Sequence, residues 1–321
     1  MGIGCAASAL ACTGLTAADP AYGDIGWGLL AVFAAAVLAD GLLLTLPRRS
    51  AAGGIMKALA LFCVNALLFT AAGIRLLGPV AIFNPRRDIA AEQALSDRGQ
   101  AELIETDGLS GWRLSCGRPD APVILCFYGN GETASRKLLE LSEWSEKGYF
   151  TGFDLAVFDY AGYGRRGGRP TEANLKTTAL AAYDCLRNDC GSVCVLGYSI
   201  GTGAANYLAA NRDVTALALI APYADGYDLY HNFLPVFHSA LTRPLVSFRM
   251  ESRSFAPDVR VKPLILASPH DGVVPFSSSE ALAERYPRAE FRPVDVPDHG
   301  AFWQSAECMR MISDWFTEAV S

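Results

Sequence analysis

One short stretch of the chain combines the residues that nucleophilic chemistry needs. Val193 to Asn206 reads VCVLGYSIGTGAAN, so an apolar run changes into Gly-Tyr-Ser-Ile-Gly and then into small residues that favour a helix. A serine on a sharp turn between a strand and a helix projects its hydroxyl clear of the sheet, and flanking glycines relieve the crowding there. The pattern therefore predicts that Ser199 is a nucleophile, with Gly197 and Gly201 making room for it.

A nucleophilic serine needs a base, and the base needs an acid that orients it. His299 follows the last apolar run, in the segment VPDHG, where a loop can hold an imidazole above a sheet. Asp271 follows the apolar run PLILAS and is the candidate acid, with Asp225 and Asp298 as its rivals. The three candidates for the reaction are thus Ser199, Asp271 and His299.

The negative charge of a tetrahedral intermediate needs hydrogen-bond donors that are already in place. The backbone N–H of Ile200 is one candidate, because it lies at the positive end of the helix expected after Ser199. The second donor is expected from the backbone of Gly129 or Asn130, in the segment VILCFYGNGE.

In this setting GYSIG resembles the nucleophile elbow of the α/β-hydrolase superfamily, and other segments match in the same chain order. VILCFYGNGE resembles the oxyanion loop, FDYAGYGRRGGRPTE resembles a segment of abhydrolase-domain and serine-aminopeptidase-like members, and KPLILASPHDGVVP and DHGAFW resemble the acid and histidine segments. The similarity covers about residues 101 to 321, and the order Ser, Asp, His is the one that this fold uses. Two residues depart from the family pattern, since Tyr128 replaces the customary histidine and Glu132 a small residue; both departures bear on the second donor.

Short apolar runs that alternate with amphipathic stretches must position these residues. This alternation predicts an α/β fold with a mainly parallel sheet and helices on both faces. The expected strands are Pro122–Tyr128, Leu155–Tyr160, Val193–Tyr198, Ala216–Ile220, Pro263–Ala267 and Glu290–Val296, and the expected helices are Ser135–Lys147, Glu172–Arg187, Gly203–Asn211 and Ser277–Arg285. An apolar insertion at about 227–258 is expected to form a short cap over the site, which either lines an acyl-chain pocket or only covers the core.

A second glycine motif raises the alternative that the chain binds a dinucleotide. Gly162, Gly164 and Gly167 follow an expected strand and formally match a dinucleotide fingerprint. That fingerprint requires a helix to begin at once, so that its N-terminus meets the pyrophosphate. Because Pro170 delays the helix, we interpret the glycines as a structural loop and expect no nucleotide cofactor.

The N-terminal part of the chain is apolar enough to suggest a membrane. Only 19% of all residues are charged, against about a quarter in typical soluble domains. Two stretches, about 25–46 and 55–77, are each long enough to cross a hydrocarbon core, which takes about 20 residues. They predict a two-helix transmembrane hairpin within an N-terminal segment 1–83, a polar connector at 84–100 and a catalytic domain at 101–321. Two buried helices of a soluble domain are the alternative.

Basic residues between the two stretches bear on the orientation of this multi-pass protein. Arg48, Arg49 and Lys57 place the loop between the helices in the cytoplasm by the positive-inside rule, which favours a catalytic domain outside it. The net charge of −6 and the lack of a Lys/Arg run give no footprint for nucleic acid. The nine cysteines show no zinc spacing with histidine, so no metal is expected, while Cys185 and Cys190 are close enough to pair in an oxidising compartment.

These features together predict a membrane-anchored serine hydrolase. It would use Ser199, His299 and Asp271 to cleave an ester, a thioester or a lipid acyl bond through an acyl-enzyme, with a small-molecule or lipid substrate and no cofactor. Two alternatives stay open: a serine peptidase of the aminopeptidase-like type, and a catalytically inactive binding module tethered to a membrane.

Overall fold

The computed structural model describes residues 51–321, except residues 100, 107, 188, 231–242, 244, 245 and 247, together with residues 34, 36–38, 41 and 45. The chain divides into two compact units. The smaller unit contains residues 1–81 and 236–247, and the larger unit contains residues 82–235 and 248–321. All the residues predicted to take part in chemistry belong to the larger unit.

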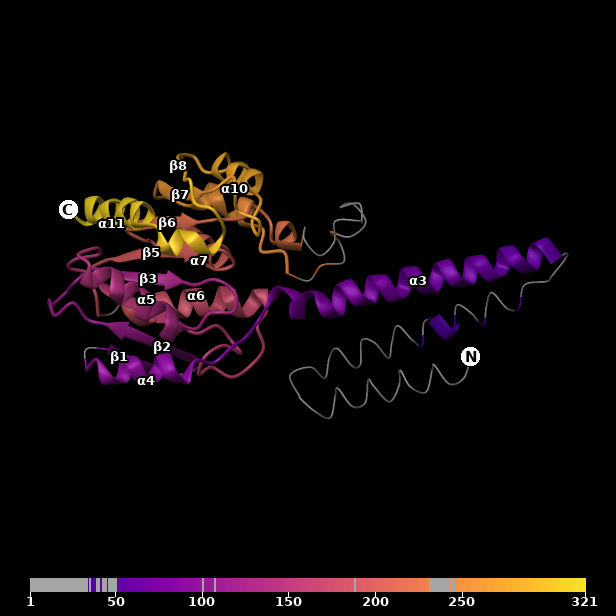
Figure 1. Cartoon of the computed structure of the whole chain (residues 1–321), viewed down its shortest axis with the longest axis horizontal. Coiled ribbons are helices and arrows are strands. Elements are labelled where there is room, and N and C mark those ends of the chain that lie inside the picture. Colours follow the sequence, from indigo (N-terminus) through magenta and orange to yellow (C-terminus); the bar gives the residue numbers. More distant parts are fainter. Residues whose placement is uncertain are drawn as a thin grey trace. The chain divides into compact units, whose positions relative to one another are not determined.

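A mainly parallel sheet forms the centre of the larger unit (Figure 1). β2 pairs antiparallel with both β1 and β4, and the other neighbours pair parallel. In the order β1-β2-β4-β3-β5-β6-β7-β8, the bounds are β1 Ala101–Thr106, β2 Leu109–Leu114, β4 Asp154–Phe158, β3 Val123–Phe127, β5 Val193–Tyr198, β6 Ala216–Ile220, β7 Pro263–Ala267 and β8 Glu290–Pro293. The predicted α/β fold with a mainly parallel sheet is confirmed.

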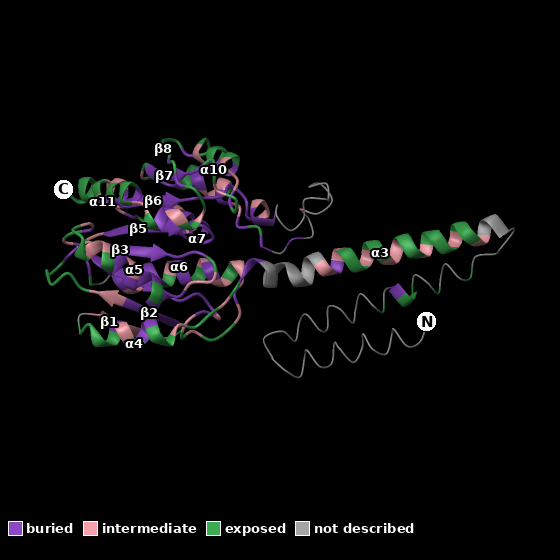
Figure 2. Cartoon of the chain, viewed as in Figure 1, coloured by how far each residue is buried: buried purple, intermediate pink, exposed green. Residues whose placement is uncertain are grey.

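Every residue of β3 to β7 is buried (Figure 2), because helices cover this sheet on both faces. α5 contacts β2 and β4, α11 contacts β6 and β7, α6 and α7 contact β3 and β5, and α10 contacts β7 and β8. Their bounds are α5 Ala134–Glu146, α6 Glu172–Arg187, α7 Gly201–Asn211, α10 Phe276–Ala283 and α11 Ala306–Val320. The four helices predicted between the strands are all present, whereas β1, β2, α4 and α11 were not foreseen.

Residues 84–100, which we expected to form a polar connector, are folded onto the larger unit. α4 (Ile89–Asp97) begins after Asp88, whose carboxylate accepts a hydrogen bond from the Ala91 N–H at 2.9 Å. The helix buries Leu95 completely and contacts α5 and β1. The polar composition of this stretch therefore reflects capping and ion pairing rather than a solvated linker.

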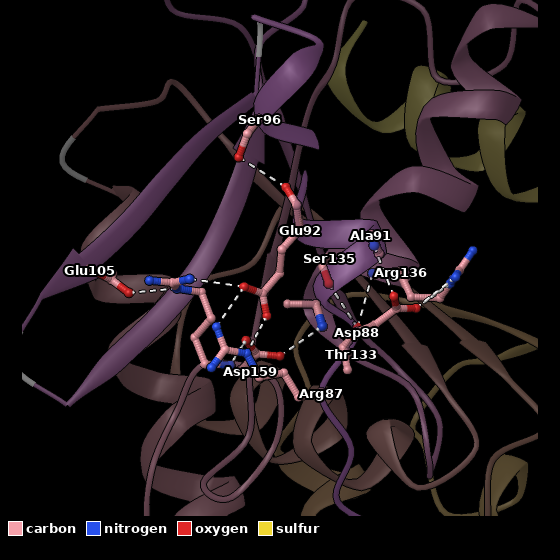
Figure 3. Close-up of polar contacts among 12 residues, drawn as sticks. Arg87, Asp88, Ala91, Glu92, Ser96, Glu105, Thr133, Ser135, Arg136 and Asp159 are labelled. Carbon is pink, nitrogen blue, oxygen red and sulfur yellow. Dashed lines mark hydrogen bonds and ion pairs between the residues drawn. The ribbon is translucent and has the colours of Figure 1, made fainter. Parts of the chain in front are cut away.

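The ion pairs of this stretch converge on Glu92 (Figure 3). Its carboxylate accepts two hydrogen bonds from Arg87, at 3.0 and 3.1 Å, and one from Arg165 at 3.0 Å. Arg165 also donates to Glu105 at 3.0 Å. Only 9% of the Glu92 side chain is exposed, so its charge depends on these partners. The guanidinium of Arg87, followed by that of Arg165, holds the pKa of Glu92 below its ordinary value.

We expect Glu92→Gln to lower the Tm at neutral pH by roughly 2–6 °C, because the two arginines then lose their carboxylate. The folded pKa of Glu92 lies below its ordinary value of 4.5, so the stabilisation is present above that pH and is lost as the pH falls through the folded pKa. The Tm difference between variant and wild type should therefore shrink in acid. Thermal melts from pH 7 to pH 3.5 measure it.

Glu290→Gln is the matched control. Glu290 also faces two cations, Lys262 at 2.5 Å and Arg292 at 3.2 Å, but its side chain is 30% exposed. Exposed pairs contribute little, so this variant should melt within about 2 °C of wild type. An equal loss in both variants would contradict a special role for the Glu92 cluster.

The smaller unit contains the long helix α3 (Ala51–Ile82) except for its last residue. The portion Gly54–Gly73 has a mean hydropathy of 1.9, and 6% of it is buried; green and pink dominate this helix in Figure 2. Large apolar side chains face outward here, namely Ile55, Met56, Leu59, Phe62, Leu67 and Phe69. Within the described residues, this is the one helix long and apolar enough to cross a membrane. The other predicted span, about 25–46, lies outside the described residues except at isolated positions, so the hairpin stays a prediction.

Candidate active site

Ser199 occupies the sharp turn between β5 and α7. Its φ is 52°, a left-handed conformation that costs a non-glycine residue about 1–3 kcal/mol. Hydrogen bonds hold the turn: the Ser199 N–H donates to the Ile220 carbonyl at 3.0 Å, and the Ser199 carbonyl accepts from the Thr202 N–H and hydroxyl at 2.9 and 2.7 Å. Strain maintained in this way is typical of a functional position.

The two flanking glycines are required by close packing. A Cβ at Gly201 would lie 2.6 Å from the carbonyl oxygen of Tyr128, and one at Gly197 would lie 2.8 Å from the Cβ of Ala205. Real Cβ atoms do not approach so closely, so both positions exclude a side chain. This agrees with the interpretation of the Gly-x-Ser-x-Gly pattern as a crowded turn.

The structure brings Ser199, His299 and Asp271 together. His299 Nε2 lies 2.8 Å from Ser199 Oγ, and His299 Nδ1 lies 2.7 Å from Asp271 Oδ2. The other carboxylate oxygen, Asp271 Oδ1, accepts from the N–H groups of Val273 and Val274 at 2.8 and 3.0 Å. Because both oxygens are engaged and only 2% of the Asp271 side chain is exposed, the carboxylate has a fixed orientation toward the imidazole.

The two rival acids are engaged elsewhere. Asp225 forms an ion pair with Arg253 at 2.6 Å. Asp298 accepts a hydrogen bond from the Ala301 N–H at 3.0 Å. The imidazole nitrogen that an orienting acid would need is already occupied by Asp271.

The imidazole rests on an aromatic platform that sequence reasoning missed. The ring of Tyr198 stacks on that of His299 with centroids 5.1 Å apart, and the Tyr198 hydroxyl donates to the His299 carbonyl at 2.8 Å. Trp303 packs edge-on against Tyr198. Lys137 Nζ, on a fully buried side chain, lies 3.7 Å from the centroid of the Trp303 ring and 2.8 Å from Glu132. The sequence does place Tyr198 inside GYSIG and Trp303 inside DHGAFW, next to predicted site residues. Their contact with Lys137 could not be predicted, because it joins parts of the chain that are distant in sequence.

The predicted oxyanion donors are not equivalent. The Gly129 N–H donates to Glu132 Oε2 at 2.7 Å, so the expectation that it faces an oxyanion is wrong. In the described residues, no group accepts a hydrogen bond from the N–H of Ile200 or Asn130. β3 and β5 are parallel neighbours with Phe127 opposite Gly197, so Asn130 and Ile200 each come three residues after a paired position. Of the three predicted donors, Ile200 and Asn130 are therefore the two whose N–H groups have no acceptor in the described residues, and their role in an oxyanion hole stays a prediction.

The two departures from the family pattern support the loop after β3. The hydroxyl of Tyr128 donates to Asp159 at 3.3 Å and accepts from the Tyr160 N–H at 3.1 Å, and the Tyr128 carbonyl accepts from the Tyr160 hydroxyl at 2.9 Å. Burial raises the pKa of the Tyr128 hydroxyl and raises that of Asp159 to about 6. Glu132 holds the Gly129 N–H and pairs with Lys137. Both residues therefore hold the loop from inside the protein.

The second glycine motif wraps around the same Asp159. Gly162 and Gly164 have positive φ, at 84° and 54°, and a Cβ at Gly164 would overlap the Asp159 carboxylate. The Arg165 N–H donates to that carboxylate at 3.2 Å. These contacts fit a structural loop.

Other predicted features can be placed only in part. Residues 231–242, 244, 245 and 247 of the predicted cap lie outside the described residues; the described parts include Gly226–Tyr230 and Ser252–Phe255, both short helical turns. Cys185 and Cys190 are free thiols. In the part of the chain that is described, no group of three or more His, Cys, Asp or Glu side chains could hold a metal ion.

Comparisons with known proteins agree with the fold described above. No protein-family model matches the chain. It is 29% identical over 157 residues to the alpha/beta hydrolase domain-containing protein aho-3 of Caenorhabditis elegans, which covers 48% of this chain and 45% of the relative. It is 29% identical over 182 residues to the lysophosphatidylserine lipase ABHD12 of Bos taurus, which covers 50% of this chain and 44% of the relative. The chain thus spans about half the length of the curated relatives it matches.

A solved structure with the same fold is the esterase Pf2001 of Pyrococcus furiosus. It superposes with a TM-score of 0.57 at 16% sequence identity and covers 74% of this chain and 97% of the esterase. At this identity the likeness shows the fold alone. The sheet order, the turn at Ser199 and the matched relatives together place the chain in the α/β-hydrolase superfamily.

Proposed function

We propose that this chain is a serine hydrolase that acts by acyl transfer. The observation that supports the proposal most strongly is the continuous chain of short contacts from Ser199 Oγ through His299 to Asp271 Oδ2, at 2.8 and 2.7 Å. A strained serine, a base and a buried acid in this order are the parts that nucleophilic catalysis requires.

The proposed reaction has two halves. In the first, Ser199 Oγ attacks the substrate carbonyl while His299 Nε2 takes its proton, and His299 then returns that proton to the leaving group as an acyl-enzyme forms. In the second, a water molecule gives a proton to His299 and attacks the acyl-enzyme. His299 then returns that proton to Ser199 Oγ as the acyl–oxygen bond breaks, which releases the acid and free Ser199. Asp271 holds a proton on His299 Nδ1, so that Nε2 faces Ser199 as an acceptor. The N–H groups of Ile200 and Asn130 stabilise the negative charge of each tetrahedral intermediate.

The proposed substrate is an ester, a thioester or a lipid acyl bond, and a lipid ester is favoured. One matched relative carries the name lysophosphatidylserine lipase. In this chain, α3 offers a 20-residue portion that is long and apolar enough to enter a bilayer. We further propose that this helix and the stretch at 25–46 form the transmembrane hairpin, with the catalytic domain outside the cytoplasm and the insertion at 227–258 as its cap.

A substrate panel tests the proposal. Full-length protein in detergent would be given a p-nitrophenyl ester, an acyl thioester, a lysophospholipid and an aminoacyl p-nitroanilide, and kcat/KM would be compared. Fastest turnover of an oxygen ester or thioester supports the proposal. Preference for the anilide would favour the peptidase alternative, and failure of all four together with no fluorophosphonate labelling would favour the inactive binding module.

Removal of residues 1–81 should leave a hydrolase that needs no detergent. The cut falls at the boundary between the two compact units and retains Ile82 and Phe83, which are 5% and 4% exposed; Phe83 packs against Phe248 with ring centroids 5.3 Å apart. We expect an unchanged kcat/KM on a soluble ester, because Ser199, Asp271 and His299 all remain. Turnover of ester in vesicles should fall by about 10²-fold, since tethering raises the local substrate concentration.

A longer truncation that begins at Ala101 is the informative comparison. It removes α4 together with Arg87 and Glu92, and should lower the Tm of the soluble fragment. Full-length protein that purifies without detergent, or a shorter truncation with undiminished vesicle activity, would contradict the membrane proposal.

A further inference from the structure

We propose that the segment just after α3 positions the second oxyanion donor, because Asn84 and Tyr163 together hold the side chain of Asn130. The proposal rests on the proposed function, since it assigns Asn130 to the oxyanion hole of Ser199. It makes Asn84 and Tyr163 positioning residues that act through Asn130 and not on the substrate.

The contacts form a small triangle around one oxygen atom. Asn130 Oδ1 accepts a hydrogen bond from the Asn84 N–H at 2.7 Å and another from the Tyr163 hydroxyl at 2.8 Å. The Asn84 N–H also lies 3.0 Å from the Tyr163 hydroxyl oxygen. Tyr163 is only 1% exposed, so its hydroxyl cannot turn to solvent. The Asn130 side chain is thus fixed, while its own N–H has no acceptor in the described residues.

The segment after α3 is itself firmly attached to this loop. The carbonyl of Arg86 accepts from the Gly164 N–H at 2.7 Å. A Cβ at Gly131 would lie 3.2 Å from the side-chain amide of Asn84, so the Asn84 side chain lies close against the backbone of Gly131. Asn84 also follows directly after the buried Phe83. The donor to Asn130 therefore belongs to a fixed part of the larger unit.

The loop is held from its other side by a separate set of groups. The Gly129 N–H donates to Glu132, whose other carboxylate oxygen lies 2.8 Å from the buried Lys137. Asn130 is thus placed between two anchored points, and rotation of its peptide would break the bonds at Oδ1. A donor fixed before the reaction costs no reorganisation when negative charge develops, which is the advantage that the Asn84 and Tyr163 contacts supply.

Tyr163→Phe tests the proposal with Tyr286→Phe as a matched control. In the control position the Tyr286 hydroxyl likewise donates to an asparagine Oδ1, that of Asn206, at 2.7 Å, and Tyr286 is 6% exposed. Removing an oxyanion donor outright costs roughly 10²–10³-fold in kcat, so loosening one should cost about 10-fold. We expect this loss in kcat on a soluble ester with KM unchanged, and a parallel loss in affinity for a boronic acid that forms a tetrahedral anion on Ser199. Tyr286→Phe should match wild type in both.

Asn130→Ala provides a second variant at an exposed position, where loss of the fold is not expected. Because both variants break the same contact, the double variant should be no slower than Asn130→Ala alone. An unchanged kcat in Tyr163→Phe, or additive losses in the double variant, would overturn the positioning role. A wild-type protein that neither hydrolyses esters nor binds the boronic acid would instead overturn the proposed function on which this role rests.

Discussion

Ser199→Ala is expected to abolish labelling by a fluorophosphonate probe and to lower kcat on a soluble ester by about 10⁶-fold. The serine oxygen forms the covalent bond in the proposed mechanism, and members of such a triad act as a unit, so that loss of the nucleophile removes their joint contribution. Activity that remains would come from donors and binding alone. Gel fluorescence after probe treatment and initial rates of ester hydrolysis measure the two effects.

Ser278→Ala is the matched control for this variant. Ser278 is 6% exposed, the same as Ser199, and its hydroxyl accepts from the Ala224 N–H at 2.9 Å and donates to Asp228 at 2.5 Å. The control removes a buried hydroxyl of similar exposure with no contact to His299. It should be labelled like wild type. Labelling that persists in Ser199→Ala would exclude Ser199 as the nucleophile.

The central strands were predictable because burial on both faces leaves a strong pattern in the sequence. β5 and β6 have the bounds that their apolar runs indicated, and β3 and β4 differ by one or two residues at their ends. β1 and β2 were not predicted, and for β1 the reason is physical. β1 is an edge strand with exposed and half-buried residues, and its sequence AELIET lacks an apolar run. Pairing with β2, rather than local sequence, stabilises it.

The helices that were missed differ in their causes. α11 buries Cys308, Met309, Ile312 and Phe316 along one face, a spacing that sequence inspection could have recognised as helical. α4 is short and rich in polar residues, and its Glu92 is buried only because Arg87 and Arg165 reach it. Arg165 comes from a loop far away in the sequence, so the burial of this charge is visible only in the folded chain.

The same distinction applies to the candidate site. Ser199, Asp271 and His299 could be proposed from the sequence, because each follows a strand pattern and parallel strands bring their carboxyl ends to one edge of a sheet. The choice between Gly129 and Asn130 as a donor could not be made in this way. It depends on Glu132, which takes the Gly129 N–H, and on Asn84, which contacts Asn130 from a segment assigned to the connector.

Asp271→Asn should lower kcat by about 10⁴-fold while the fold is retained. An asparagine keeps the shape of the carboxylate but loses its charge, and its amide can favour the tautomer in which His299 carries the proton on Nε2, where it no longer accepts from Ser199. The N–H groups of Val273 and Val274, which bind Asp271 Oδ1, can still bind the asparagine oxygen. That would leave the amide nitrogen toward the imidazole. Initial rates and thermal melts of the purified variant measure activity and fold.

Asp298→Asn and Asp225→Asn separate this role from a general loss of negative charge. Asp298 is adjacent in sequence to the base, yet its carboxylate accepts a hydrogen bond from the Ala301 N–H. An asparagine oxygen can accept the same hydrogen bond. The kcat of Asp298→Asn should therefore stay within about 10-fold of wild type. Asp225→Asn breaks the ion pair with Arg253, which joins two structural segments. This variant should therefore have a lower Tm, while its kcat should stay close to that of wild type. Only Asp271 combines burial with contact to His299 Nδ1. If either of the other two variants lost more activity than Asp271→Asn, the orienting acid would have to be assigned to that residue.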